Sequence, residues 1–281
     1  MPEDTIMAEI HLPERAVITL AGDDAEHFLQ NLITTDLDRI GPAEAWPGAL
    51  LTPQGKVMFD FLISRTDTGF AIETHAEDAA SLLQRLMLYK LRAKVTIAAE
   101  ETDGVTVFTG DDAPDTAVTD MRFSPASITV KRLPGRHGNP DPEAYKALRI
   151  EAGVPEMHAD YGPQDAFPHD LLFDRNGAVS FRKGCFVGQE VVSRMQHRGT
   201  ARRRLVLVRG AEALPAAGTT IHADGKPAGE LGSVAGDAAM AILRIDRAAS
   251  AENLTAGDVA VTVTPYAWSG ITLEPSGAEA E

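Results

Sequence analysis

The pattern of apolar residues changes at about residue 205 and sets the first constraint on the fold. From there on, short apolar runs alternate with closely spaced glycines, in the stretches LVLVRG, GTTIHADGKPAGELGSVAG, AAMAILRID and DVAVTVTPYAW. Short strands joined by glycine turns at this spacing are typical of a small barrel or sandwich. The sequence therefore predicts a C-terminal β-barrel domain over residues 205–271, followed by a disordered tail over residues 272–281.

Residues 1–204 mix helical and strand periodicities. The stretch RAVITLAGDDAEHFLQNLITTDL predicts a strand, a turn and an amphipathic helix, because the apolar residues from Ala25 to Ile33 recur at helical spacing. The stretch GALLTPQGKVMFDFLISRTDTGFAIETH predicts an antiparallel meander, and a second helix follows near Asp78 to Lys90. This order, closed by the strand KVTIAA, favours a split α+β layer and disfavours a Rossmann sheet.

The best-marked helix boundary lies in the connection LPGRHGNPDPEAYKALRIEAGVPE. Asp141 can cap this helix, Pro142 suits its first position and Gly153 suits its end. Glu151 then lies in the last turn, where a carboxylate opposes the helix dipole at a cost of about 0.3 to 1 kcal/mol. Either water screens this carboxylate or another group binds it.

Asp60 interrupts the apolar strand KVMFDFLIS. Because side chains alternate along a strand, Asp60 shares a face with Met58 and Leu62, and the other face is wholly apolar. A carboxylate between apolar neighbours on one face lies near a sheet edge or points into a pocket, and the sequence leaves both interpretations open.

The chain has a single cysteine, Cys185, and a formal net charge of -15. One cysteine cannot form an intrachain disulfide or supply a Cys-rich zinc or iron–sulfur ligand set, so any cluster would have to be shared or transient. The histidines show no metal-ligand spacing, and no metal site is predicted. The acidic start MPEDTIMAEI and the lack of an apolar run of about 18 residues favour a cytoplasmic protein.

Positive charge is concentrated in residues 182–204, where seven basic residues accompany one acidic residue, Glu190. The acidic remainder repels nucleic acid, and no aromatic residues are interleaved with the arginines, so direct nucleic-acid binding is not expected. A basic run of this kind is commonly a solvated surface. A compact polyanion, such as a folate polyglutamate tail, fits a single patch better.

Cys185 lies within this basic segment. A helix is predicted to begin near Gly188, which places the thiol at or just before a helix N-terminus with Lys183 close by. Both features favour the thiolate, and the flanking glycines allow close approach of a ligand or a partner. The alternative is that Cys185, next to Phe186, is a small buried apolar residue.

The segment KGCFVGQE, residues 183–190, resembles the signature of the YgfZ-type folate-binding proteins. These are relatives of the glycine-cleavage aminomethyltransferase (T-protein) that act in iron–sulfur cluster assembly and repair. The stretch VITLAGDDAEHFLQNLITTDL resembles that family's opening strand and helix, LLTPQGKVMFDFLI its glycine-turn hairpin, RIEAGVPE its folate-contacting segment and AGELGSVAGDAAMAILRID its closing barrel. The resemblance extends over nearly the whole chain.

The resemblance implies an α+β fold, with two interleaved lobes over residues 1–204 and a C-terminal barrel around a central channel that binds tetrahydrofolate. Glu151 matches the acid that contacts the pterin, and Cys185 matches the signature thiol. We expect the other cofactor-binding residues to be Asp60, Lys183, Gly184, Gly188, Gln189, Arg194 and Arg198.

The implied function is that of a tetrahydrofolate-binding accessory protein in iron–sulfur cluster assembly or repair, which indirectly supports tRNA modification by cluster enzymes. Its partners would be folate and the assembly machinery or client cluster proteins, and no membrane partner is expected. Cys185 would act as a thiolate toward a partner, a cluster under transfer or an oxidised cofactor.

Two alternatives stay open. A one-carbon transferase would use Asp60 or Asp78 as its base, although IETHAEDAASLL lacks a clean match to the Asn-Ala segment and later aspartate of the aminomethyltransferases. A folate sensor or scaffold would use Cys185 only for packing. The sequence does not decide whether the protein is an enzyme.

Overall fold

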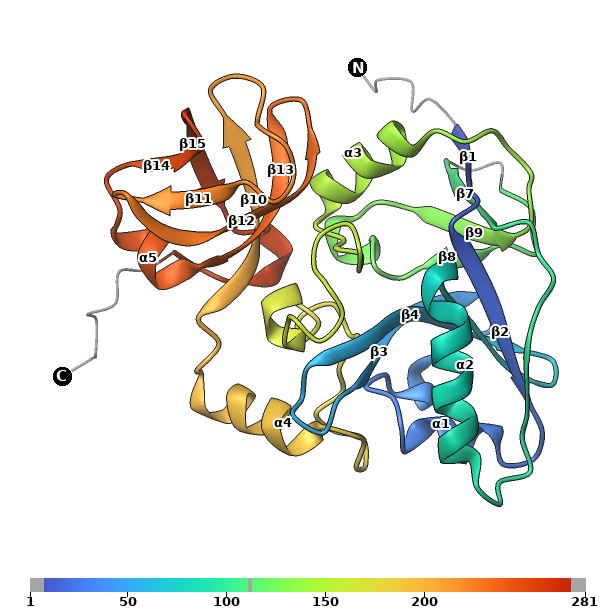
Figure 1. Cartoon of the computed structure of the whole chain (residues 1–281). Coiled ribbons are helices and arrows are strands. Elements are labelled where there is room, and N and C mark those ends of the chain that lie inside the picture. Colours follow the sequence, from blue (N-terminus) through green and yellow to red (C-terminus); the bar gives the residue numbers. More distant parts are fainter. Residues whose placement is uncertain (1–7, 111–112, 274–281) are drawn as a thin grey trace. The chain divides into compact units, whose positions relative to one another are not determined.

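The computed structural model describes residues 8–110 and 113–273 (Figure 1). The chain forms two compact units. The sheet unit contains Met1–Pro142 and Asn176–Gln189, and the barrel unit contains Glu143–Arg175 and Glu190–Glu281. The chain therefore passes between the units three times. From residue 274 on, the predicted tail lies outside the described residues.

The sheet unit is built on a nine-stranded sheet with the order β1-β7-β9-β8-β3-β4-β5-β2-β6. Its strands pair antiparallel, except for the parallel pair of β3 and β8. The strands are β1 (Ala8–Leu12), β2 (Arg15–Ala21), β3 (Glu44–Leu51), β4 (Val57–Thr66), β5 (Gly69–His75), β6 (Thr96–Ala99), β7 (Val105–Thr109), β8 (Val118–Asp120) and β9 (Val130–Pro134). The predicted meander is the run β3-β4-β5, whereas the sequence pattern does not predict β1 or β7 to β9.

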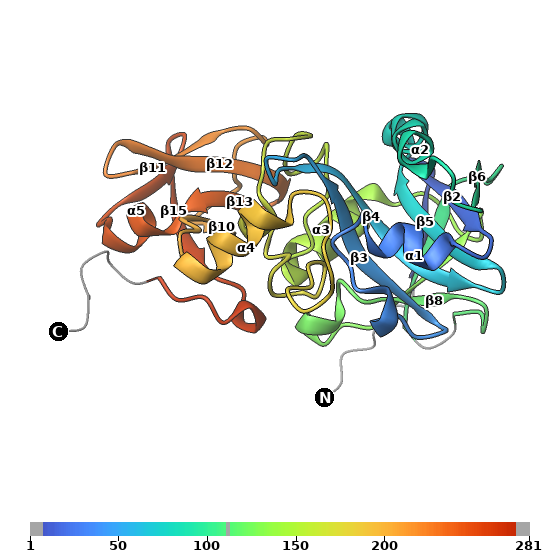
Figure 2. The same ribbon diagram turned by 90° about the horizontal axis from the view of Figure 1, so that it is seen from below.

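Two helices cover one face of this sheet (Figure 2). From α1 (Ala25–Gln30) and α2 (Ala76–Lys90), side chains such as Leu29 and Leu86 pack against alternate strand residues such as Phe61. The side chains between those strand residues lie on the opposite face, because successive residues of a strand point to opposite sides.

The helix predicted over residues 25–33 is shorter in the structure, since α1 ends at Gln30. Leu32 and Ile33 are buried, but they lie in the turn that follows. The apolar spacing therefore identified the buried side chains and overstated the helix, because a turn can also bury consecutive apolar residues.

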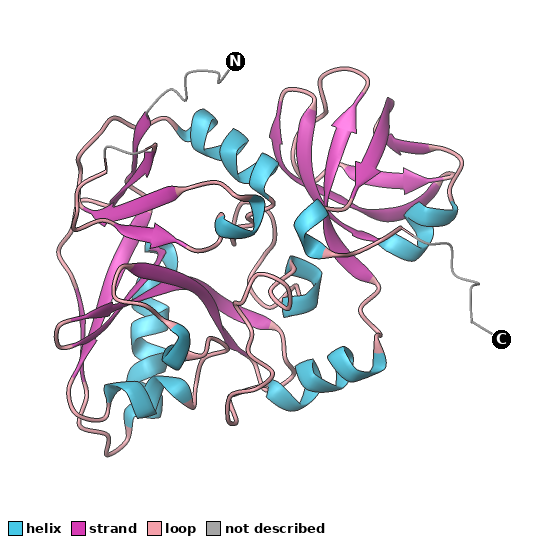
Figure 3. Ribbon diagram, turned by 180° about the vertical axis from the view of Figure 1, so that it is seen from behind, coloured by secondary structure: helices cyan, strands magenta, loops and turns pink. Residues whose placement is uncertain are grey.

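The barrel unit holds a closed six-stranded barrel with the order β10-β13-β12-β11-β14-β15, drawn in magenta in Figure 3. The strands are β10 (Arg203–Gly210), β11 (Thr220–Ala223), β12 (Lys226–Ala235), β13 (Ala238–Arg244), β14 (Leu254–Ala256) and β15 (Val259–Thr264). Its interior is filled by small aliphatic residues such as Val206, Ala239 and Ala241. The predicted C-terminal barrel is confirmed, and the domain boundary between residues 204 and 205 stays a prediction.

Helices α3 and α4 agree with the local signals in the sequence. α3 (Pro142–Ala152) begins at the expected proline and ends before Gly153, which adopts a φ of 72°. α4 (Gln189–Arg198) begins next to Gly188, as predicted. The other short helices are α5 (Ile245–Ser250), η1 (Leu37–Arg39), η2 (Ser124–Ala126), η3 (Pro168–Leu171) and η4 (Ala267–Ser269). The α+β class is confirmed, and the central channel stays a prediction.

Candidate functional site

The signature segment exposes its cysteine. Cys185 and Gly184 are exposed, whereas Lys183 and Phe186 on either side of them are buried. The interpretation of Cys185 as a small buried residue is therefore wrong. Its thiol is open to solvent, to a ligand or to a partner.

The buried Lys183 holds the signature segment to the loop after α1. Its Nζ donates hydrogen bonds to Ile33 O at 2.9 Å and to Thr35 O at 2.6 Å. Burial lowers the pKa of Lys183 to about 8, although the carboxylates of Asp36 and Asp38 act in the opposite direction. The ammonium group that was expected to assist the thiol is thus bound by two backbone carbonyls.

The two glycines of the segment have different roles. Gly188 has a φ of 79°, and a Cβ at this position would lie 2.6 Å from Thr52 O, so a larger residue would be strained. Around Gly184, no atom of the described residues other than the glycine itself and its two chain neighbours lies within 4 Å of the place that a Cβ would take. Gly188 therefore serves chain packing, and Gly184 leaves room next to the thiol.

The basic residues after the signature differ in their surroundings. In α4, Arg194 Nη2 donates to Glu190 Oε1 at 2.6 Å in an exposed pair, and Arg198 is exposed at the end of the helix. Arg204 is buried, and its Nη1 donates to Asp174 Oδ1 at 2.8 Å. Arg204 therefore supports the fold, while Arg194 and Arg198 remain candidates for binding an anionic tail.

Glu151, near the end of α3, has a partner on the barrel. Both of its carboxylate oxygens accept hydrogen bonds from Arg209 Nη2, at 2.6 and 2.8 Å, and about half of its side chain is exposed. The sequence left open whether water or another group meets this carboxylate. A guanidinium group does so and offsets the unfavourable helix dipole.

Two aromatic side chains close the end of the same helix. Tyr266 Oη donates to Ile150 O at 2.8 Å, and Trp268 Nε1 donates to Ala152 O at 3.1 Å. Carbonyls in the last turn of a helix lack the partner that the next turn would supply. Ile150 O also accepts a long bond from the Gly153 N–H at 3.4 Å, and the two side-chain bonds complete the capping of this end. Burial raises the pKa of Tyr266 and keeps its hydroxyl protonated. The sequence gives no local sign of these contacts, because residues 266 and 268 follow the last barrel strand.

The two carboxylates considered as a base lie on different elements. Asp60 is half-buried in β4, opposite Ala49 of β3, on the face away from α1 and α2. β4 has a neighbouring strand on each side, but its pairing with β5 covers only Leu62–Thr66, so Asp60 lies beyond the paired part on that side and both interpretations stay open. Asp78 is buried in the first turn of α2. A binding or catalytic role of either residue stays a prediction.

A buried charged network lies on that same face of the sheet. Glu73 accepts hydrogen bonds from Arg15 Nε at 2.9 Å and from Arg132 Nε at 2.8 Å. Asp120 lies 3.3 Å from Arg132 Nη1 and accepts from Arg122 Nη2 at 2.7 Å. Burial would raise the pKa of Glu73, but the positive charges of Arg132 and Arg15 outweigh it and lower the pKa to about 2.

No local sequence pattern could have revealed this network. Its members come from β2, β5, β8, β9 and the residues directly after β8. β9 and β5 are four positions apart in the strand order, so the sheet must curl for their side chains to meet. The network is a product of tertiary structure.

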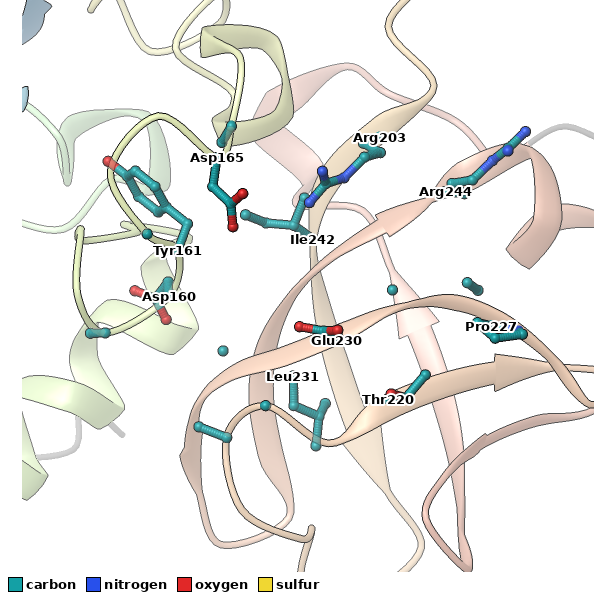
Figure 4. A pocket seen from close by; sticks show the side chains of 18 of the residues that line it. Asp160, Tyr161, Asp165, Arg203, Thr220, Pro227, Glu230, Leu231, Ile242 and Arg244 are labelled. Carbon is teal, nitrogen blue, oxygen red and sulfur yellow. The ribbon is translucent and has the colours of Figure 1, made fainter. Parts of the chain in front are cut away.

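A cavity lies in each unit, and no predicted site residue lines either one. The cavity of the sheet unit has a volume of about 230 Å³ and borders the charged network. That of the barrel unit, about 740 Å³, lies between the loop 158–166 and strands β10 to β13. Figure 4 shows Tyr161 and Asp165 of this loop beside Arg203 and Ile242 of the barrel. Because charges of both signs line it, the cavity does not favour one class of ligand.

Comparison with known proteins finds one family match for the barrel and several relatives that match most of the chain. Residues 202–271 match the family described as the CAF17 C-terminal beta-barrel domain, a range that contains every strand of the closed barrel. The chain is 32% identical over 216 residues to the mitochondrial iron-sulfur cluster assembly factor IBA57 homolog of Pyricularia oryzae, with 69% of this chain and 55% of the relative covered. It is 29% identical over 248 residues to the tRNA-modifying protein YgfZ of Enterobacter sp., with 76% and 75% covered.

A solved structure shares the fold. The glycine cleavage system aminomethyltransferase T from Bartonella henselae superposes with a TM-score of 0.71 over 94% of this chain and 86% of that chain, at 14% sequence identity. Together with the IBA57 and YgfZ matches, this fold fits the YgfZ and T-protein superfamily. The T-protein-like fold expected from the resemblance is confirmed. The chain spans about half the length of the IBA57 relative from Pyricularia oryzae.

The cytoplasmic location expected from the sequence is wrong. The IBA57 members of the superfamily that match this chain, from fungi, mouse and human, are named as mitochondrial proteins. Among the described residues, no helix is both long enough and apolar enough to span a bilayer.

Proposed function

We propose that this protein is an iron–sulfur cluster assembly or repair factor in which Cys185 is the group that meets the cluster or the partner that carries it. The IBA57 relatives are named as iron-sulfur cluster assembly factors, and YgfZ is named as a tRNA-modifying protein. Both names fit one role: a factor that supports iron–sulfur enzymes, including the iron–sulfur enzymes that modify tRNA.

The observation that carries this proposal is the exposure of Cys185. It is the single cysteine of the chain, and it is exposed between the buried Lys183 and Phe186. The bonds of Lys183 to the loop after α1 and the packing of Gly188 hold the segment at both ends. A thiol on a supported loop can be presented to a partner without ordering the loop first.

One thiolate supplies only one of the ligands that a cluster needs, since clusters are commonly held by four. A cluster at Cys185 would therefore be shared with the partner that delivers or receives it. Coordination would release the thiol proton, because the thiolate is the ligand. The cluster is then cargo in transit, and Cys185 is a handover point.

Tetrahydrofolate is the second part of the proposal. Glu151 fits the role of a pterin ligand in one respect: its carboxylate is half-exposed and is engaged by a single nitrogen of Arg209, which leaves lone pairs for further donors. The N–H groups of a pterin could occupy them. When bound, tetrahydrofolate would supply a reduced pterin able to carry a one-carbon unit.

Calorimetry with tetrahydrofolate tests this part. Wild-type protein should bind, and Glu151→Ala should lose affinity by at least about ten-fold, because a charge-assisted hydrogen bond contributes roughly 1.5 to 3 kcal/mol. Glu143→Ala is the matched control, since Glu143 is an exposed carboxylate of the same helix that pairs with Lys146. Absence of heat from wild-type protein at millimolar folate would remove folate from the proposal and leave the role of Cys185 untouched.

The T-protein-like fold favours a second candidate, a one-carbon transferase with Asp60 or Asp78 as its base. The two functions separate on Cys185→Ala. A transferase would retain its turnover in that variant, whereas a cluster factor would fail to support cluster enzymes.

A further inference from the structure

The C-terminal end of α2 carries a cluster of exposed apolar side chains. Met87, Leu88 and Leu91 are 48%, 64% and 89% exposed, and they are the exposed large hydrophobic residues of the part of the chain that the structure describes. Leu86 belongs to the core, and Leu88 lies about 200° further round the helix, so it faces away from the sheet. Figure 1 shows the chain turning back directly after α2. Packing within the protein does not explain these residues.

Leu91 also adopts a backbone conformation that leucine disfavours. The Ala93 N–H donates to Lys90 O at 2.8 Å and closes a tight turn, in which Leu91 has a φ of 44° and a ψ of -103°. These angles are close to those of the first central position of a type II′ turn, which is dominated by glycine. A leucine that is both strained and almost fully exposed is a candidate for a role outside the protein.

The charge around this cluster is of one sign. Residues 79–99 contain no carboxylate and four basic residues, Arg85, Lys90, Arg92 and Lys94, in a chain with a net charge of -15. Arg92 and Lys94 are exposed. One carboxylate from outside the segment contacts it, since Asp24 Oδ2 accepts a hydrogen bond from the Lys94 backbone N–H at 2.7 Å. The local excess remains positive.

We propose that this α2-end surface, made of Met87, Leu88, Leu91, Arg92 and Lys94, binds the surface of an anionic lipid bilayer. Protruding aliphatic side chains would enter the boundary between headgroups and acyl chains, and the flanking cations would meet lipid phosphates. The protruding aliphatic side chains flanked by cations match the composition of surfaces that lie in a bilayer interface, and a protein partner is the alternative outcome of the test.

This contact differs from a membrane span, for which no helix of the described residues is long and apolar enough, and it departs from the expectation of no membrane partner. No segment needs to cross the bilayer, because the surface lies on it. The net charge of the chain opposes approach to an anionic bilayer, but at physiological salt this repulsion is screened beyond about 8 Å. The proposal is independent of folate and of Cys185.

Vesicle co-sedimentation tests the proposal on the full chain. We expect wild-type protein to sediment with phosphatidylcholine vesicles that contain phosphatidylserine as about a third of the lipid, to remain in solution with phosphatidylcholine alone, and to dissociate as salt is raised. Leu88→Glu with Leu91→Glu should lower the partition coefficient at least about ten-fold. Arg92→Glu with Lys94→Glu should do the same, since each cation near an anionic surface strengthens binding by about five-fold.

Two controls keep the result decisive. Arg136→Glu with Lys226→Glu changes the net charge by the same amount at exposed positions elsewhere and should leave binding within about two-fold. Leu91→Gly should weaken binding without lowering the melting temperature, because glycine adopts this turn without strain. Failure of wild-type protein to bind the anionic vesicles would overturn the proposal. It would also be overturned if Arg136→Glu with Lys226→Glu lost as much vesicle binding as Arg92→Glu with Lys94→Glu. A patch that binds no vesicle would then be a protein-docking surface.

Discussion

Two buried cations, one in each unit, stabilise the surroundings of the two main site candidates in different ways. Lys183, in the signature segment, donates to two neutral backbone carbonyls, and burial lowers its pKa to about 8. Arg149, two residues before Glu151, donates to Asp160 Oδ2 at 2.7 Å and lies 3.4 Å from Glu156. Burial would lower the pKa of Arg149, but these two carboxylates outweigh it and raise the pKa.

The difference shows what a buried charge needs. Carbonyl oxygens satisfy the hydrogen bonds of an ammonium group but leave much of its desolvation penalty, whereas carboxylates also supply opposite charge. The segment that presents Cys185 therefore depends on a group that can lose its proton near pH 8. The end of α3 depends on a group that stays charged.

The largest expected effect is that of Arg149→Met. This change leaves Asp160 and Glu156 buried without their cation, and breaking a buried pair costs about 3 to 5 kcal/mol in the free energy of unfolding. Urea denaturation measures it. Arg209→Met is the matched control, because its pair with Glu151 is exposed and should contribute less than about 1 kcal/mol. If Arg149→Met and Arg209→Met lowered the free energy of unfolding equally, the buried pair would contribute no more than the exposed one, contrary to this account.

A smaller effect is expected from the titration of Lys183. Its pKa is about 8 in the folded protein and about 10.5 when unfolded, so between these values the unfolded chain binds more protons. The free energy of unfolding should therefore rise with pH across this window, by up to about 3 kcal/mol from this group, and should gain nothing from it below pH 8.

Lys183→Met isolates this contribution. Subtracting its stability curve from that of wild-type protein removes the titration of all other groups, and Lys226→Met, at an exposed lysine, controls for the loss of a charge. Parallel curves for wild type and Lys183→Met between pH 8 and 10.5 would contradict the proposed state of Lys183.

The smallest effect is expected from Glu151→Gln. Because this carboxylate is half-exposed, its pair with Arg209 should contribute less than about 1 kcal/mol, and the melting temperature should change by no more than a few degrees. Glu143→Gln, in the first turn of the same helix, provides the reference. A loss as large as that of Arg149→Met would show that Glu151 is a structural anchor rather than a site residue.

The parts of the fold with local signals could be predicted from the sequence. Pro142 and Gly153 mark α3, Gly188 marks the start of α4, and repeated glycine turns mark the barrel. The strands β7 to β9 could not be predicted, because β7 pairs with β1 and β8 with β3, partners far away in the chain, and β9 is held between β7 and β8.

The sequence predicted the position of the candidate site but not which of its residues are exposed. The signature motif located Cys185, but its exposure and the burial of Lys183 depend on the loop after α1. Arg204 belongs to a basic run that predicts a solvated surface, yet it is buried against Asp174, which lies 30 residues away in sequence. Tertiary contacts decide which residues of a charged run face water.

The central claim is that the exposed thiol of Cys185 acts in cluster assembly or repair. Complementation of cells lacking the protein, read out as the activity of an iron–sulfur enzyme, tests it most directly when wild type and Cys185→Ala are compared at equal abundance. We expect Cys185→Ala to unfold at the wild-type temperature, because the side chain is exposed, and to restore no more than about a tenth of the enzyme activity. Restoration to the wild-type level by Cys185→Ala would contradict the claim.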